Sequence, residues 1–198
     1  WRHQTEKVVK SCRDKLAGLW KCTEVLKKHQ RKIKAEAIIM SRLSYCLEVV
    51  STGRKKDMEK LQGVQSAAAR WVAQTRSRDW HLKSGLKRLG WLSMCQQAAY
   101  ASLKTAIKVL REKKPERLYE TLVEAVGGEW RRKVLDEKKV MKMKVSTKKA
   151  WSIRSLRWMA QMPEELIEKD VKLKSTKKEL KEWVRGAVPV KGYSGVRS

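Results

Sequence analysis

Phenylalanine is absent from this chain of 198 residues, and proline and glycine are scarce, with three and ten residues. So few helix-breaking residues leave long stretches free to form helices. No run of about 18 apolar residues occurs, so no membrane-spanning helix is expected. The four cysteines form no Cys-x-x-Cys pair, which argues against a disulfide framework and favours an intracellular chain. Cys12, Cys22 and His29 lack the spacing of a zinc site, and no cofactor is expected.

Acidic residues are also few, with 21 Asp and Glu against 48 Lys and Arg and a formal net charge of +27. A compact chain with this excess repels itself unless a polyanion compensates the charge. An anionic membrane surface is disfavoured, because membrane-bound basic helices carry broad apolar faces and often a lipid signal, and neither is found. The expected partner is therefore a nucleic acid, and the expected location is the nucleus before the cytoplasm.

Apolar residues recur every three or four positions, which predicts an all-α fold. We expect a multi-helix bundle with a basic, partly irregular C-terminal extension. The expected divisions are a helical bundle over 1–128, a basic linker or helix over 129–149, a small helical segment over 150–186 and a disordered tail over 187–198. The expected helices lie at about 5–28, from Ile33 to about Val50, from Met58 to Val72, at 81–89, at 93–111, from Pro115 to Gly127, from Pro163 to Ile167 and at 173–184.

An apolar series and the tryptophans stand out within this pattern. The apolar series lies in the helix expected from Ile33 to about Val50 and consists of Ile33, Ala37, Met40, Leu43 and Leu47. Nine tryptophans suit both core packing and base stacking. Trp20 and Trp71 lie on apolar stripes and are predicted to be core residues. Trp80 closes the polar loop 74–80, after Arg76 and Arg78, and is a candidate for contact with a partner.

Motifs that carry catalysis are missing from the sequence. It has no glycine-rich phosphate loop, no Gly-x-Ser-x-Gly, no His-Glu-x-x-His and no Asp-Asp pair. The three histidines lie far apart, and no neighbour in the sequence makes any of them a general base. The chain is therefore expected not to be an enzyme.

Several segments together resemble one family of proteins. Ile38–Cys46 contains Ser-Arg-Leu-Ser-Tyr, and Leu61–Arg70 reads Leu-Gln-Gly-Val-Gln-Ser-Ala-Ala-Ala-Arg. Together with four later segments, these two resemble the region downstream of the catalytic core in the reverse transcriptases of non-LTR (LINE-type) retrotransposons. The later segments occur in the same order as in that family and are Leu89–Leu92, Pro115–Leu122, Trp158–Leu166 and Lys177–Trp183. The similarity spans nearly the whole chain.

The resemblance implies a helical thumb and the region that follows it, which grip a template–primer duplex. The fingers and palm with their catalytic aspartates are absent, so no polymerase chemistry is implied. The Cys/His zinc knuckle of some relatives is absent as well. Met159 stands where the family has Asn, and Lys177 stands where it has Phe.

The function predicted from charge and resemblance is a non-catalytic nucleic-acid-binding module of retroelement origin, which holds RNA or an RNA-containing duplex through its phosphates. One alternative is a structural or interaction protein, docked by apolar helix faces in a large ribonucleoprotein or other assembly. Another is an accessory part of a polymerase whose active site lies on a companion chain. The predicted contacts are Arg54, Lys55, Lys56, Arg76, Arg78, Trp80, Arg131, Arg132, Lys133, Lys138, Lys139, Lys142, Lys144, Lys148 and Lys149.

Overall fold

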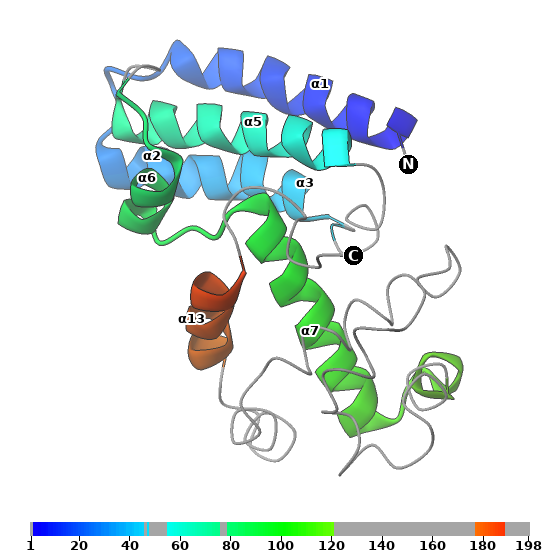
Figure 1. The fold of residues 1–198 in the computed structure, drawn as a ribbon. Helices are drawn as coiled ribbons and strands as arrows, with labels where there is room; N and C mark the ends of the chain where they lie inside the picture. Colours follow the sequence, from blue (N-terminus) through cyan, green and yellow to red (C-terminus); the bar gives the residue numbers. More distant parts are fainter. Residues whose placement is uncertain (1, 46, 48–54, 76–78, 121–176, 189–198) are drawn as a thin grey trace. The chain divides into compact units, whose positions relative to one another are not determined.

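The computed structural model describes residues 2–45, 47, 55–75, 79–120 and 177–188 (Figure 1). The predicted all-α class is confirmed, and these ranges contain no β-strand. The helices are α1 (Arg2–Trp20), α2 (Lys28–Ala35), the π-helix η1 (Glu36–Met40), α3 (Ser41–Ser44), α5 (Lys55–Ala73), α6 (Leu82–Leu89), α7 (Met94–Glu112) and α13 (Lys177–Ala187). Residues 116–120 are also helical.

The described residues divide into two compact units, one up to Gln97 and one from Ala98 to Val188. Helix α7 begins in the first unit and continues into the second. The predicted boundary at residue 128 and the segment 129–149 lie outside the described residues. So does most of the predicted segment 150–186, of which α13 is described, and of the predicted tail, of which residues 187 and 188 are described.

The first unit is built around α5, which packs against α1 on one side and α2 on the other (Figure 1). Helix α1 also contacts η1 and α3, and α6 packs on α5, so one core is enclosed. The core keeps apolar side chains away from water, which is the main force that holds these helices together. Its most deeply buried large side chains are Trp71, Ile39, Leu43, Leu47, Leu92, Met94, Gln65 and Val64.

The π-helix η1 interrupts the continuous helical segment that α2 begins and α3 ends. The residues buried along this helix recur every four positions, at Arg31, Ala35, Ile39 and Leu43. A regular α-helix advances 100° per residue, so three steps of four residues would rotate the buried side by about 120° away from the core. The wider turn at Glu36–Met40 offsets this rotation and keeps Ile39 and Leu43 against the core.

A buried arginine fixes the connection between α1 and α2. Arg31 is 5% exposed. Its Nε donates to the carbonyl of Val72 at 3.3 Å, and its Nη1 donates to the carbonyls of Thr23, at 3.1 Å, and Leu26. Val72 lies in the last turn of α5, where carbonyl groups lack helical partners and the helix dipole favours a cation. The guanidinium therefore joins turn 21–27 to the end of α5.

The end of α6 is a tight reversal at Gly90. Gly90 has φ 69° and ψ 17°, the left-handed conformation that glycine adopts most readily. The Gly90 amide donates to the carbonyl of Lys87 at 3.0 Å, and the Trp91 amide donates to that of Leu86 at 2.9 Å. These two bonds form a Schellman motif, which ends α6 at Leu89.

Side chains of α5 and α7 fix the beginning of α7. The Ser93 amide donates to Gln96 Oε1 at 3.0 Å, and the Gln96 amide donates to Ser93 Oγ at 3.3 Å, a reciprocal capping box. The Met94 amide donates to Gln62 Oε1 of α5 at 2.9 Å. The first orphan amides of α7 are thus paired, and α7 is anchored to α5.

Two sequence predictions for the first helix are wrong. The first helix ends at Trp20 instead of residue 28, because residues 21–27 form turns. Trp20 is 47% exposed, and Ile33 is 61% exposed, so neither is a core residue, and Ala37 is exposed too. The cause is that Arg31 occupies the buried side of α2, which places Ile33 on the outer side. Trp71, by contrast, is fully buried as predicted.

In the second unit, apolar side chains of α7 and α13 are buried. Leu103 and Ala106 of α7 have no exposed surface, and Leu180 and Val184 of α13 are 3% and 0% exposed. Helix α13 spans Lys177–Ala187, so its end lies three residues after the predicted bound of 184, whereas the predicted start at 173 lies outside the described residues.

The three described cysteines are expected to react with a thiol reagent in order of their burial. Cys12 is fully buried, Cys95 is partly buried and Cys22 is exposed. Burial also raises the pKa of the Cys12 thiol, with Arg42 and Lys15 acting in the opposite direction, so the reactive thiolate is disfavoured in the folded chain. Alkylation of the native protein, followed by peptide mass spectrometry, is expected to label Cys22 first and Cys12 last. Equal rates in urea are the control, and early labelling of Cys12 would contradict this packing.

Removal of the buried guanidinium is expected to destabilise the first unit. The Arg31→Ala variant leaves three carbonyl groups without a donor, and we expect it to lose about 2–4 kcal/mol of unfolding free energy. Arg42→Ala is the matched control, since exposed Arg42 donates to Ser11 Oγ of α1 at 2.9 Å, and a loss below about 1 kcal/mol is expected. The unfolding free energy of both variants is measured by urea titration, with exposure of the Cys12 thiol as the signal of unfolding. Equal midpoints for the two variants would refute the role given to Arg31.

Candidate nucleic-acid interface

Three of the predicted contact residues, Lys55, Lys56 and Trp80, fall within the described residues. The remaining predicted contacts lie outside them, and these are Arg54, Arg76, Arg78, Arg131, Arg132, Lys133, Lys138, Lys139, Lys142, Lys144, Lys148 and Lys149. The part of the interface that can be described is therefore on the first unit.

Lys55 and Lys56 lie in the first turn of α5, and both are exposed. The amino end of a helix carries partial positive charge, so lysines there oppose the helix dipole and are expected to weaken the helix slightly. Asp57, next in the chain, is buried and has the charge that this end favours. Neither lysine forms an ion pair in the part of the chain that the structure describes. These charges remain available to an external anion.

A second group of lysines gathers where α1 ends and α2 begins. Lys21, Lys27 and Lys28 are exposed there, beside exposed Trp20 and Val25. We call these five residues the turn surface. Within the described ranges, none of the three lysines forms an ion pair. This group is not among the predicted contacts, because the apolar spacing predicted that residues 21–28 continue the first helix.

The turn surface has a fixed backbone. Trp71 Nε1 donates to Thr23 Oγ1 at 2.8 Å, and Thr23 Oγ1 donates to the Trp20 carbonyl at 2.6 Å. Arg31 holds the Thr23 carbonyl from the other side, and the Lys27 amide donates to Gln30 Oε1 at 2.9 Å. Buried side chains of α5 and α2 therefore determine where these lysines are presented.

The turn surface and the Lys55–Lys56 pair lie at opposite ends of α5. The turn surface is held to the last turn of α5 through Val72 and Trp71, and the lysine pair lies in the first turn. At 1.5 Å per residue, the two ends are separated by about 26 Å along the helix axis. A B-form DNA duplex rises about 3.4 Å per base pair, so about eight of its base pairs are needed to reach from one to the other, and an A-form duplex needs somewhat more.

Trp80, predicted as a contact in a loop, lies against its own chain. Its residue is partly exposed, and the six-membered ring covers Gly85 of α6. A Cβ atom at Gly85 would lie 2.2 Å from Trp80 Cη2, so only glycine leaves room for the ring. The indole Nε1 is buried without a hydrogen-bond partner. Most of this side chain is used to pack the loop onto α6.

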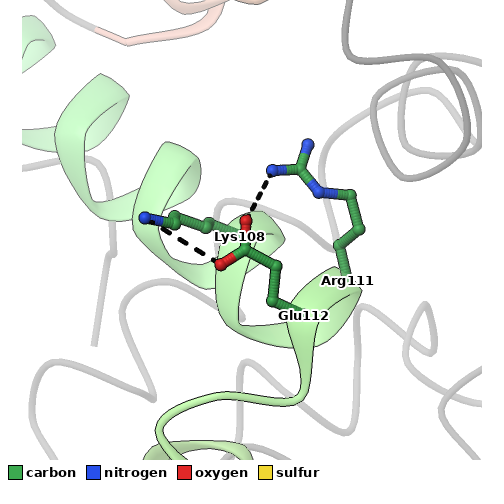
Figure 2. Close-up of polar contacts among 3 residues, drawn as sticks. All are labelled: Lys108, Arg111 and Glu112. Atoms are coloured by element: carbon green, nitrogen blue, oxygen red, sulfur yellow. Dashed lines mark hydrogen bonds and ion pairs between the residues drawn. The ribbon is translucent and has the colours of Figure 1, made fainter.

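The second unit has basic residues along α7. Figure 2 shows Glu112 between two of them, with Lys108 Nζ 3.9 Å from Oε2 and Arg111 Nη2 3.0 Å from Oε1. Lys108 and Glu112 are 62% and 43% exposed, and exposed pairs of this kind contribute little to stability. The shared carboxylate lowers the local positive charge, so Lys108 and Arg111 are partly neutralised within the chain, unlike the lysines of the turn surface.

Two of the segments on which the family resemblance rests meet in the first unit. Gln65, which has no exposed surface, donates from Nε2 to the Leu92 carbonyl at 2.8 Å. Gln62 Nε2 donates to Gln65 Oε1 at 2.8 Å, and Gln62 in turn accepts from the Met94 amide. The Gln-x-x-Gln of Leu61–Arg70 thus binds the backbone beside Leu89–Leu92, which gives both motifs a structural role.

The described residues contain no group of three or more His, Cys, Asp or Glu side chains placed to hold a metal ion. None of the helices in the described ranges combines the length and the apolar character needed to cross a bilayer. Comparison of the chain with protein-family models, with curated proteins and with solved structures finds no match. The functional argument therefore rests on the charges and geometry of the chain itself.

The contact between Trp80 and Gly85 makes a prediction that a double-mutant cycle can test. Gly85→Ala forces the ring to move, and a loss of about 1–3 kcal/mol of unfolding free energy is expected. In a Trp80→Ala background the same substitution is expected to be nearly neutral or stabilising, because the clash is gone. Gly63→Ala in α5 is the control, since a Cβ there meets nothing within 4 Å and the helix gains propensity. A loss that is the same in both backgrounds would show that the ring lies elsewhere.

Proposed function

We propose that this chain is a non-catalytic nucleic-acid-binding module of retroelement origin, which holds RNA or an RNA-containing duplex mainly through its phosphates. The observation that carries the proposal is a set of exposed lysines without ion pairs among the described residues, Lys21, Lys27, Lys28, Lys55 and Lys56, on a chain of net charge +27. Phosphates neutralise such charges and release counterions, which makes binding favourable without base-specific contacts.

The placement of Lys55 and Lys56 supports an external ligand in particular. Their charge opposes the dipole of α5, so they are not explained by helix stability. A backbone-binding surface needs such charges at intervals that match a phosphate chain. The two lysine groups, separated by about 26 Å along α5, suit a ligand at least eight or so base pairs long.

Retroelement origin is proposed from the resemblance to the region downstream of the catalytic core in LINE-type reverse transcriptases. The contact between the Gln62–Gln65 pair and the segment that begins α7 supports it, because motifs far apart in the sequence then serve one structural purpose. The catalytic aspartates of that family are missing, so the module would bind and not polymerise. A nuclear location is part of the same proposal.

A second candidate function is a structural protein docked in a larger assembly. Exposed Val25 and Ile33, at 85% and 61%, favour it, because apolar side chains of this size are suited to a protein partner. The two functions differ in their response to salt. Apolar docking survives high salt, whereas phosphate binding weakens steeply as salt rises.

The proposal is tested by titrating the full chain with labelled single-stranded RNA, duplex RNA, RNA–DNA hybrid and duplex DNA over a salt series. Each phosphate contact is expected to contribute a slope of about −0.9 to the plot of log affinity against log salt for a duplex. We expect that replacement of Lys55 and Lys56 by Gln weakens duplex binding and makes the slope less steep by about 1.8.

The matched control is Lys83→Gln with Lys87→Gln, an exposed pair on the outer side of α6 that removes the same net charge. Its slope is expected to stay close to that of the wild-type chain. If both double variants change the slope equally, net charge alone is responsible and the assignment to α5 is wrong. If the wild-type chain binds none of these nucleic acids at low salt, the proposed function is wrong.

A further inference from the structure

We propose that Trp20 is a stacking platform for an unpaired base, next to the lysines of the turn surface that hold the adjoining phosphates. The inference rests on the proposed function and deepens it, because it assigns a single-stranded segment of the nucleic acid to one place on the chain. A ligand bound here would combine a duplex or single-stranded backbone with at least one unstacked base.

The exposure of Trp20 sets it apart from the other described tryptophans. It is 47% exposed, whereas Trp71 and Trp91 are 0% and 7% exposed. Both of these side chains also donate a hydrogen bond from Nε1 that holds them in the fold. Trp71 donates to Thr23 Oγ1 at 2.8 Å, and Trp91 donates to Glu36 Oε1 at 2.7 Å. A half-exposed indole contributes less to the core and leaves a flat apolar surface for a flat partner.

The backbone under Trp20 is fixed, so the indole starts from a set position. The Trp20 carbonyl accepts from Thr23 Oγ1, and Thr23 in turn accepts from the buried indole of Trp71. Arg31 binds the Thr23 carbonyl. Because the backbone is already ordered, only the freedom of the indole side chain is lost when a base binds, which favours affinity.

The charges around Trp20 select the class of partner. Lys21 follows it directly, and Lys27 and Lys28 close the same turn, while Glu24 is the one acidic residue among residues 21–28. An aromatic ring among cations is the arrangement that binds single strands, because bases stack on the ring while the cations bind phosphates. An apolar protein helix would cover the ring without using these lysines.

The test compares two probes of equal length and charge, a single-stranded oligonucleotide and its abasic counterpart, with the full wild-type chain and with Trp20→Ala. The wild-type chain is expected to bind the probe with bases about tenfold more tightly, as for one stacked base. Trp20→Ala is expected to remove this difference and to bind the abasic probe as the wild type does. Trp20→Phe is expected to restore most of it. Tyr45→Ala, which removes another exposed aromatic ring at 74%, is expected to change nothing.

The outcomes separate this inference from the function on which it rests. If Trp20→Ala keeps the preference for bases, or if the wild-type chain binds both probes equally well, stacking on Trp20 is wrong while phosphate binding stands. If the wild-type chain binds neither probe at low salt, the proposed function fails and the inference fails with it. Protection of Cys12 from alkylation shows that each variant is folded, since this thiol is buried in the first unit.

Discussion

The first unit depends on one buried cation. Arg31 brings a positive charge into the protein where three backbone carbonyls need donors, two from turn 21–27 and one from the last turn of α5. Burial of an unpaired charge would be very unfavourable, so the guanidinium requires these carbonyls as much as they require it. Trp71 adds a neutral bond to the same turn. The positions of α1, α2 and the lysines between them follow from this arrangement.

Helix α5 supplies hydrogen-bond partners to an earlier and to a later part of the chain. Its last turn holds the connection that precedes α2, and its middle, through Gln62 and Gln65, holds the start of α7. Amide side chains suit this purpose, because they can accept from a backbone amide and donate to a backbone carbonyl at once. The exposed lysines on the outer side of the unit are therefore not needed to hold its helices together.

Much of the fold could be predicted from periodicity, and the errors have physical causes. The spacing of Met58, Leu61 and Val64 marks α5 correctly, since ordinary apolar residues form its buried side. The rule fails at α2, because the residue that occupies the buried side is Arg31, which no hydrophobic pattern reveals. It also fails at Trp20, where the helix ends and the stripe no longer faces a neighbour. The turn surface could not be predicted for the same reason, whereas charge alone is enough to predict Lys55 and Lys56 as contacts, and both are exposed.

The π-helical turn at Glu36–Met40 makes the length of this helix adjustable. Its wide turn accommodates one residue more than a regular helix would need to keep Ala35 and Leu43 on the same side. Deletion of one residue within it would leave buried positions spaced four, three and four apart, which a plain α-helix places on a single face. The segment therefore resembles a regular helix that has absorbed a one-residue insertion while Arg31, Ala35, Ile39 and Leu43 all stay buried.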